Sequence, residues 1–295
     1  MILKKIYKRC VIHKWEIGFV ETPLSDVIGN ADIKVRWIRH NYKDRWFADP
    51  FILDANDNEI SLLVEEYLDF TGLGRISRLI IDRKTYCLKE LIPVLELPTH
   101  LSFPAILRYK GEVYIYPENS QSGNLKLYRY NTESNECLLI DNIMPKPLTD
   151  AVIAEIYDEN YILSTSLPDP NGDTLKVYCL NADTRSSDYN VKFEENIARN
   201  GGAVFKHDGS YYRPAQEEKS GMYGIAISIQ KIGLDCDNHL TFEEVRRITS
   251  PDKSLDLGFH TFNVYKDLIV VDAKGFRHPR LGRFCYFLKH LFGYK

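Results

Sequence analysis

The chain has 295 residues, of which 44% are hydrophobic, 12% aromatic and 27% charged, a composition that predicts a folded globular protein and excludes extensive disorder. No run approaches the roughly 18 apolar residues of a membrane span, and the basic N-terminus lacks the apolar stretch of a signal peptide. We therefore expect a cytoplasmic protein, with peripheral contact at the inner face of the membrane as a further option.

The net charge of −3 hides an uneven distribution. Residues 1–15 and residues 276–295 each carry five Lys or Arg and no acid, so the two ends contribute +10 and residues 16–275 carry −13. An acidic body argues against nucleic acid as a partner, because that affinity comes mainly from a broad basic face. The basic ends instead suggest an anionic membrane surface or a partner protein.

Six cysteines lie far apart in the chain, without a CxxC pair or a Cys/His cluster. Zinc-site and redox-motif spacings are therefore absent, and neither a metal nor a cofactor is predicted. Buried thiols in a reducing compartment are the expected state of these residues.

A repeated pair of short apolar strands runs along the chain. The five copies cover residues 49–66, 103–118, 150–164, 201–216 and 260–272, and their starts are 54, 47, 51 and 59 residues apart. Third and fourth strands follow several copies, and Asp82, Asn131 and Asn181 stand at the matching turn between them, where side-chain carbonyls can close a hairpin.

Four short strands repeated five times predict an all-β fold, a five-bladed β-propeller, rather than a generic β-sandwich. The predicted organisation is a basic N-terminal extension (1–15), the propeller (16–275) and a basic aromatic C-terminal tail (276–295). Only 192–199 and the tail have a helical pattern.

Equivalent residues near the strand starts of a propeller converge on a central funnel, which makes them candidates for a site. Asp49, Asp150 and His260 hold such positions, and Asn200 opens the fourth repeat. Further candidates near the ends of second strands and on the same rim are Glu66, Glu118, Arg213, Gln216 and Tyr223.

Each candidate also has a structural interpretation. Asp49 before Pro can be a turn pair, Asp150 can cap its own turn, and His260 can be a core histidine. A bidentate Arg213 suits a carboxylate or phosphate ligand, but it can also pair with a neighbouring glutamate, Glu217 or Glu218. Most aromatic residues of these segments are expected in the packing between blades, with a few near the funnel suited to stacking on sugar rings.

Several motifs in order resemble a known family. They are Trp46-Phe-Ala-Asp-Pro-Phe51, Ser102-Phe-Pro104, Pro117-Glu118-Asn-Ser120, Asn200-Gly-Gly202, Arg213-Pro-Ala-Gln216, Tyr223-Gly224 and Gly258-Phe-His-Thr-Phe-Asn263. Over residues 15–275 the chain resembles the N-terminal domain of plant glucosamine inositolphosphorylceramide transferases. That domain is in turn similar to the propellers of arabinanase and xylosidase-type glycoside hydrolases.

The resemblance to these hydrolases implies that Asp49 is a general base and that Asp150 orients and tunes the site. It puts Asn200 at the place of the general acid, and an amide cannot protonate a leaving oxygen. An ordinary hydrolase is therefore disfavoured, unless Glu118 or Glu66 supplies the acid.

The expected function is carbohydrate-active, in the making or handling of surface polysaccharide or glycolipid, with a sugar, sugar nucleotide or lipid-linked glycan as partner. In glycosyl transfer from a phosphate-activated sugar, Asp49 would activate the acceptor, and Arg213 with His260 would hold the phosphate. A glycan-binding module without turnover is the alternative, so the residues leave open whether the chain is an enzyme.

The C-terminal tail interleaves aromatic and basic residues. A helix over 281–292 would present Phe284, Leu288, Leu291 and Phe292 on one side. Such a segment can lie on an anionic membrane surface, or it can pack on the propeller with its charges solvated.

Overall fold

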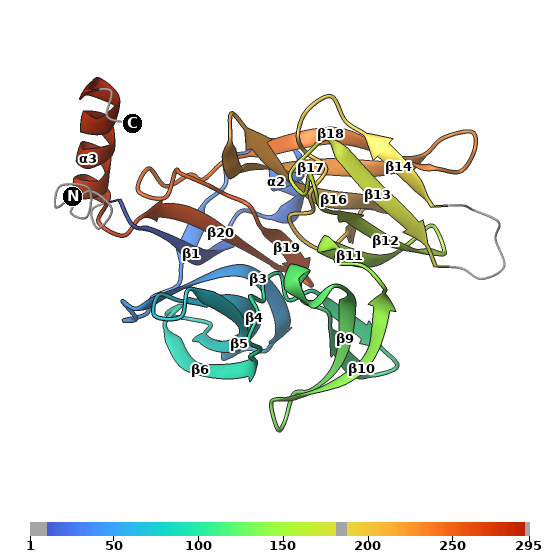
Figure 1. The fold of residues 1–295 in the computed structure, drawn as a ribbon, viewed down its shortest axis with the longest axis horizontal. Coiled ribbons are helices and arrows are strands. Elements are labelled where there is room, and N and C mark those ends of the chain that lie inside the picture. The colour runs from blue at the N-terminus through green and yellow to red at the C-terminus, as the bar shows by residue number, and fades with distance from the viewer. Residues whose placement is uncertain (1–10, 181–187, 293–295) are drawn as a thin grey trace.

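Five four-stranded antiparallel sheets stand around a central axis in the computed structural model, which describes residues 11–180 and 188–292 (Figure 1). The predicted all-β fold, a five-bladed β-propeller, is confirmed. The repeated hairpins supply the two inner strands of each blade, as their shared pattern predicted.

Consecutive strands build the first four blades. Blade one holds β3 (Arg45–Ala55), β4 (Glu59–Leu68), β5 (Leu73–Asp82) and β6 (Leu88–Leu95). Blade two holds β7 (Ile106–Tyr109), β8 (Glu112–Ile115), β9 (Leu125–Asn131) and β10 (Glu136–Met144). Blade three holds β11 (Thr149–Ile156), β12 (Glu159–Thr165), β13 (Thr174–Cys179) and β14 (Tyr189–Lys192). Blade four holds β15 (Phe205–His207), β16 (Ser210–Lys219), β17 (Met222–Leu234) and β18 (Leu240–Ile248).

Blade five combines strands from the beginning and the end of the described chain. Its order is β19 (Phe262–Tyr265), β20 (Leu268–Phe276), β1 (His13–Val20) and β2 (Val35–Trp37). The β1–β20 register runs from His13 opposite Phe276 to Val20 opposite Ile269. The sheet therefore includes residues 13–15 of the predicted N-terminal extension.

Apolar side chains fill the spaces between neighbouring blades. Between blades four and five, Phe259 and Phe262 pack in one buried cluster with Ile227 and Ile229. Burying a side chain of this size contributes about 2 kcal/mol to stability. The prediction that the aromatic residues mainly pack between blades is confirmed by such clusters.

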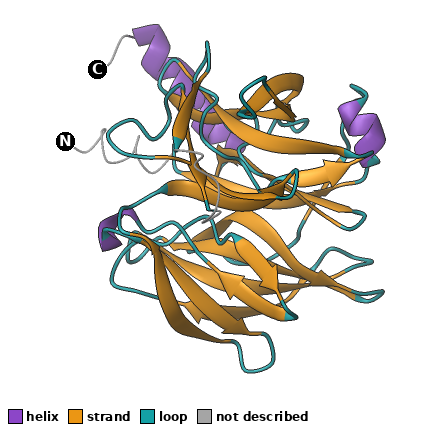
Figure 2. Ribbon diagram, turned by 90° about the vertical axis from the view of Figure 1, so that its right-hand side faces the viewer, coloured by secondary structure: helices purple, strands orange, loops and turns teal. Residues whose placement is uncertain are grey.

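The helices lie outside the sheets (Figure 2). The predicted helix over 192–199 is wrong, because β14 continues to Lys192 and bends follow. Its apolar spacing arises instead from a connection that buries Ile197 and Ala198. The short helices α2 (Leu24–Ile28) and η1 (Ser120–Ser122) were not predicted.

The tail helix was predicted over 281–292 and is found as α3 (Pro279–Phe292). Phe284 is exposed and Leu288 half-buried, while the side chains of Leu291 and Phe292 lie outside the described part. In the part of the chain that the structure describes, no helix is long and apolar enough to cross a membrane.

The predicted hairpin turns are present where the structure describes them. Asp82 Oδ1 accepts the backbone N–H groups of Lys84 and Thr85, and Asn131 Oδ1 accepts those of Glu133 and Ser134. Asn181 lies outside the described residues.

The prediction of buried cysteines is wrong for those that the structure describes. Cys87, Cys137, Cys179 and Cys285 are half-buried and Cys236 is exposed, while Cys10 lies outside the described part. They stand on outer strands, a loop and α3, where one side faces solvent.

Candidate functional site

The funnel is built where the inner strand of each blade begins. Asp49, Phe103 and Asp150 hold equivalent places in three blades, with φ angles of 49°, 44° and 43° in the left-handed region. This backbone conformation costs about 1–3 kcal/mol per residue and persists only where surrounding bonds hold it.

Asp49 N–H donates to Asp272 Oδ2 at 2.9 Å, and Phe103 N–H donates to Asp49 Oδ2 at 3.0 Å. Asp150 N–H donates to Glu118 Oε2 at 3.0 Å, so each strand entry is bonded to a carboxylate of the preceding blade.

Asp150 is the centre of an ion-paired group on one side of the funnel. It is 1% exposed, and its Oδ2 accepts hydrogen bonds from Arg199 Nε at 2.6 Å and Gln216 Nε2 at 2.7 Å. Glu118 Oε2 lies 3.5 Å from Arg199 Nη2. Burial, together with the Asp150 carboxylate, raises the pKa of Glu118 well above its usual range. Burial therefore favours the protonated form of Glu118, and Arg199 pairs with the Asp150 carboxylate.

Asp49, His260 and Asp272 form a second buried group. His260 Nδ1 lies 2.7 Å from Asp272 Oδ1, and His260 Nε2 lies 3.4 Å from Asp49 Oδ1. Burial raises the pKa of Asp49 to about 8, with His260 acting in the opposite direction. Burial alone would lower the pKa of His260, but the Asp272 carboxylate outweighs it and the pKa is raised. Each shift favours the protonated form of its group, and the two groups titrate together because they lie in contact.

The same three residues are the one group among the described residues whose donor atoms could surround a metal ion, since their ligand atoms lie within 4.8 Å of one another. Asp272 is poorly suited to that role. Its two oxygens accept bonds from the backbone N–H groups of Asp49, His260 and Thr261, from the Thr261 hydroxyl and from the imidazole. These bonds occupy its lone pairs, so the donor set fits a bonding hub better than a metal centre.

Aromatic side chains enclose the imidazole of His260. The Trp15 ring stacks on it with centroids 3.8 Å apart and an interplanar angle of 14°, and the Tyr223 ring meets it edge-on at 5.4 Å. Gly224, with φ of +60°, permits this approach, since a Cβ there would lie 2.6 Å from His260 Cβ. The Arg199 guanidinium covers the Tyr223 ring at 4.9 Å.

The funnel mouth is consequently shallow. Its hollow is lined by residues from blades three and four, including Asn171, Arg199, Gln216 and Tyr223, and leaves essentially no room for a water-sized molecule. Ligand pockets for small molecules usually have about 300–1,000 Å³. Side chains of the protein itself therefore fill most of the space above Asp49 and Asp150.

Comparison with known proteins assigns this chain to a family. Residues 35–257 match the family model described as glucosamine inositolphosphorylceramide transferase 1, N-terminal. The chain belongs to this family. Two curated relatives are glucosamine inositolphosphorylceramide transferase 1 of Arabidopsis thaliana, 29% identical over 216 residues, and that of Oryza sativa subsp. japonica, 29% identical over 220 residues. Each alignment covers 70% of this chain but only 27% and 28% of the relatives, so the chain spans about a quarter of their length.

Solved structures show the same fold in glycosidases. A GH43_1 enzyme from Xanthomonas citri superposes with a TM-score of 0.53 at 13% identity, covering 78% of this chain and 88% of the enzyme. The RS223 β-xylosidase superposes with a TM-score of 0.54 at 11% identity, covering 78% and 92%. At these identities the likeness concerns the propeller fold alone.

Asn200 is a structural amide within this family member. Its Nδ2 donates to the backbone carbonyls of Asp150 at 2.7 Å and Leu163 at 2.8 Å, and its Oδ1 accepts Arg213 Nε at 2.7 Å. The side chain thus ties blade four to blade three, and because it is fully buried it does not reach a substrate.

Arg213 does not reach the funnel. It is 0% exposed, and each guanidinium nitrogen donates to protein oxygens, those of Asn200, Gln230 and two backbone carbonyls. The alternative pairing with Glu217 or Glu218 is also wrong, because Glu217 pairs with Arg247. Without a carboxylate partner, burial lowers the pKa of Arg213 to about 9. The predicted phosphate contact of Arg213 therefore has no available donor.

Strand alternation separates Glu66 from the funnel. Glu66 accepts bonds from Arg45, Arg75 and Ser77 and is fully buried, so it is not a free acid. The neighbouring Glu65 lies on the funnel side instead, where its charge contributes to the raised pKa of Asp49 and where it pairs with His100 Nε2 at 3.3 Å.

The structure brings together Asp49, Asp150, Glu118, Gln216, Tyr223 and His260 as predicted site residues, with Asn200 bonded beneath them. The sequence prediction missed Arg199 and Trp15. Arg199 had a usable signal, because it directly precedes Asn200 in the shared register. Trp15 had none, since its place depends on the pairing of β1 with β20.

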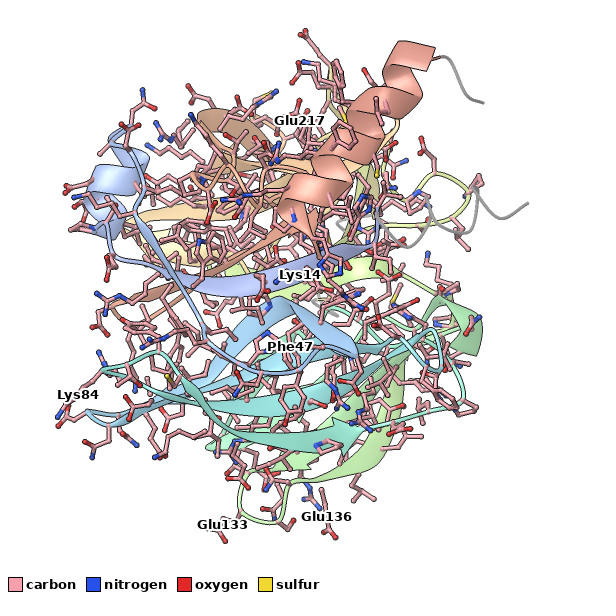
Figure 3. The ribbon with its side chains drawn as sticks, turned by 90° about the vertical axis from the view of Figure 1, so that its left-hand side faces the viewer. Lys14, Phe47, Lys84, Glu133, Glu136 and Glu217 are labelled. Carbon is pink, nitrogen blue, oxygen red and sulfur yellow. The ribbon has the colours of Figure 1, made fainter. Side chains whose placement is uncertain are left out.

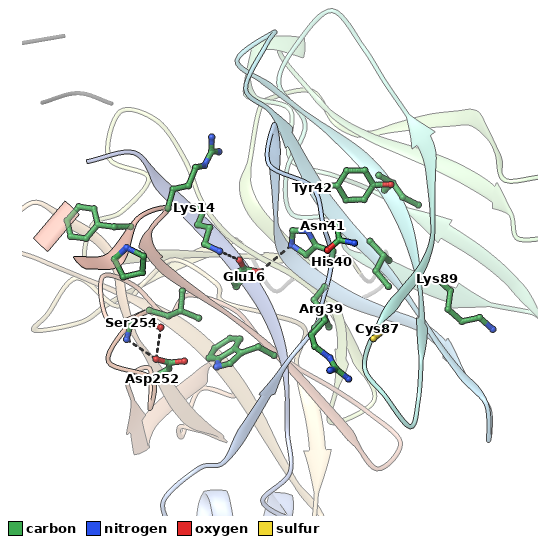
Figure 4. Close-up of a pocket in the computed structure, with 18 of the residues that line it drawn as sticks. Lys14, Glu16, Arg39, His40, Asn41, Tyr42, Cys87, Lys89, Asp252 and Ser254 are labelled. Carbon is green, nitrogen blue, oxygen red and sulfur yellow. Dashed lines mark hydrogen bonds and ion pairs between the residues drawn. The ribbon is translucent and has the colours of Figure 1, made fainter. Parts of the chain in front are cut away.

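A larger cleft of about 820 Å³ lies outside the funnel, between blades five and one (Figure 4). Lys14, Glu16 and His40 meet along one side of it, and Figure 3 shows Lys14 on β1 beside the base of α3. Lys14, Lys89 and Arg277 line the cleft, and each is already paired with a carboxylate. These pairs reduce the attraction of the cleft for an anionic ligand.

Proposed function

We propose that this chain recognises a sugar at the mouth of its funnel, in the service of glycolipid or surface-glycan glycosylation, and that it does not hydrolyse glycosidic bonds. Family membership supports a carbohydrate-related role. Because the chain spans about a quarter of the length of its relatives, the glucosamine and inositolphosphorylceramide in their names come to this chain only as a proposal.

The observation that carries the proposal is the state of Asn200. In the glycosidases that the sequence resembles, this position supplies the acid that protonates the leaving oxygen. Asn200 has no acidic proton, and its amide is fully engaged by the carbonyls of Asp150 and Leu163 and by Arg213. Glu66 is equally engaged, which leaves Glu118 as the remaining candidate for the acid.

The rim has the chemistry of sugar recognition. Asn171 and Gln216, whose Oε1 has no hydrogen-bond partner, offer polar groups for hydroxyls, and the half-buried Tyr223 offers a ring. Because the hollow has essentially no free volume, a sugar would bind across the mouth rather than reach Asp49.

A second candidate is glycosyl transfer from a phosphate-activated donor, favoured by the Asp49–His260–Asp272 array. A base with a pKa of about 8 is matched to work near neutral pH, and a phosphate leaving group needs no acid. In this version Asp49 takes the proton of the acceptor hydroxyl and His260 supports the charge.

The test combines binding and turnover. Purified protein is titrated with glucosamine, N-acetylglucosamine and inositol phosphate by calorimetry, and is then assayed with sugar nucleotides and nitrophenyl glycosides. We expect saturable binding that is lost in Tyr223→Ala and kept in Tyr109→Ala, an exposed tyrosine in the β7–β8 turn at the other end of the strands.

The outcomes separate the candidates. Binding without turnover supports recognition, and nucleotide release that disappears in Asp49→Asn supports transfer. Hydrolysis of an aryl glycoside that disappears in Glu118→Gln would overturn both versions. No binding to any of the three probes would count against recognition at the funnel.

A further inference from the structure

Helix α3 turns its large apolar side chains away from the protein. Leu281, Phe284 and Phe287, spaced three residues apart, are 46%, 59% and 60% exposed. The side toward the propeller is small, because Gly282 packs against Phe276, where an added Cβ would clash. Figure 1 shows α3 at the edge of the propeller, apart from the blades. A helix that served only to cover the propeller would turn its apolar residues inward.

The helix is nevertheless held in place at its base. The Arg283 guanidinium donates to the Lys253 carbonyl and to Asp256 Oδ1, the latter at 2.5 Å. Both acceptors belong to the loop that leads to His260. The outward direction of Phe284 and Phe287 is therefore a fixed feature of the fold.

A fourth apolar side chain stands beside the base of α3. Phe70, in the β4–β5 turn, is 97% exposed. Its neighbour Asp69 pairs at 2.7 Å with Arg277, which connects β20 to α3. We call Phe70, Leu281, Phe284 and Phe287 the apolar edge.

Positive charge gathers at the same edge. Lys14, Arg277, Arg280 and Arg283 belong to β1, to α3 or to the connection into α3. Lys14, Arg277 and Arg283 pair with Glu16, Asp69 and Asp256, which reduces their attraction for phosphates, and the exposed Arg280 adds its charge beside them. The pairing of His13 with Phe276 brings the start of β1 next to the connection into α3, although residues 16–275 carry −13. Apolar side chains flanked by Lys and Arg match the interface of an anionic bilayer, where the rings enter the headgroup region and the cations meet phosphates.

The apolar edge lies on the funnel side of the propeller. Strand β4 passes Glu65 on the way to the Phe70 turn, and β20 passes Asp272 on the way to α3. Since Glu65 and Asp272 both belong to the funnel group around Asp49, the strands carry the apolar edge beyond the funnel mouth.

We propose that the apolar edge docks this protein on an anionic membrane surface, with Phe284 and Phe287 in the headgroup region and the funnel mouth turned toward the lipid headgroups. The docking itself is independent of the sugar chemistry. Its link to a lipid-borne sugar rests on the proposed function, and it would make the headgroup sugar of a glycolipid the ligand that reaches Tyr223.

Vesicle sedimentation of the full chain tests the docking. We expect binding to vesicles of mixed phosphatidylcholine and phosphatidylglycerol, weak binding to phosphatidylcholine alone, and loss of binding as salt is raised. The double variant Phe284→Ser/Phe287→Ser should bind at least about tenfold more weakly, since two buried rings are lost. The matched control is Leu138→Ser/Leu139→Ser on β10, two exposed apolar residues outside the edge, which should bind like the wild type.

Several results would overturn the docking. They are wild-type binding that ignores phosphatidylglycerol and salt, unchanged binding of the Phe284/Phe287 variant, and a concentration-dependent dimer that this variant abolishes, which would assign the edge to a second copy of the chain. The lipid and salt dependence of the wild type stands even if a variant fails to fold.

Failure of docking and failure of the proposed function are distinguishable. The Phe284→Ser/Phe287→Ser variant should still bind soluble sugar, and Tyr223→Ala should still bind vesicles. Loss of both properties in either variant would contradict the separation of the two sites.

Discussion

Burial of Asp49 makes the stability of the propeller depend on pH. Its pKa rises from an ordinary 3.8 to about 8 on folding, so the folded state binds a proton that the unfolded state releases above about pH 4. A raised pKa stabilises the fold below the unfolded value, and this contribution is lost as the pH rises through the folded value. Stability should therefore fall between about pH 5 and pH 8.

The magnitude follows from the shift. One pKa unit corresponds to about 1.4 kcal/mol, and with a folded pKa of about 8 the loss from pH 5 to pH 8 is about 3–4 kcal/mol for one proton. Asp49→Asn keeps a neutral side chain of the same size at all pH values, so this part of the slope should vanish. A smaller slope should remain, because Glu118 and His260 also have raised pKa values and act in the same direction.

Urea unfolding followed by circular dichroism at several pH values measures this slope. Asp237→Asn is the control, since it removes the same charge from an exposed loop and should leave the wild-type slope unchanged. A wild-type stability that stays level or rises toward pH 8 would refute the reasoning, as would an Asp49→Asn slope equal to that of the wild type.

Three further predictions concern the bonds around the funnel, each measured by urea unfolding. Arg199→Met leaves Asp150 buried without its cation and should cost about 3–5 kcal/mol, with part of the loss recovered in Arg199→Lys; a loss below about 1 kcal/mol would contradict a buried ion pair. Asn200→Ala removes two hydrogen bonds to blade three and one to Arg213 within blade four and should cost about 3 kcal/mol, whereas Asn124→Ala, outside the funnel, should cost less; equal losses would argue against the bridging role. Gly224→Ala should cost more than Gly221→Ala, because both have positive φ but only the Cβ at 224 meets His260; the opposite order would speak against the tight packing of the imidazole.

The repeat predicted the propeller well, because each strand pair of a blade has a local pattern of apolar residues that can be recognised in a short stretch of sequence. The shared register also predicted Asp49, Asp150 and His260 near one funnel, where His260 Nε2 lies 3.4 Å from Asp49 Oδ1 and the charge of Asp150 acts on both. Side-chain direction was less predictable. Glu65 and Glu66 are adjacent in sequence, and a one-residue uncertainty in a strand exchanges the funnel side for the buried side.

Residues whose place depends on long-range pairing could not be predicted. Trp15 reaches His260 only because β1 joins β20, and no local pattern announces that contact. Arg213 shows a different limit, since its residue type suggested an anion while its surroundings supply only neutral acceptors. Composition reports which groups are available, but only the packing decides which of them remain unpaired.

The pairing of β1 with β20 has a consequence for synthesis of the chain. Strands β1 and β2 leave the ribosome before the other strands of the propeller, but their partner β20 ends at Phe276. They therefore remain unpaired with β20 while the four other blades are made. During that time the edge of β1 has unpaired backbone groups that can pair with another nascent chain. Closing the ring joins residues 249 to 263 positions apart, which makes this step intrinsically slow. Aggregation should therefore be most severe for chains interrupted before β19, and a circular permutant that begins at β3 would place all four strands of blade five in one continuous stretch.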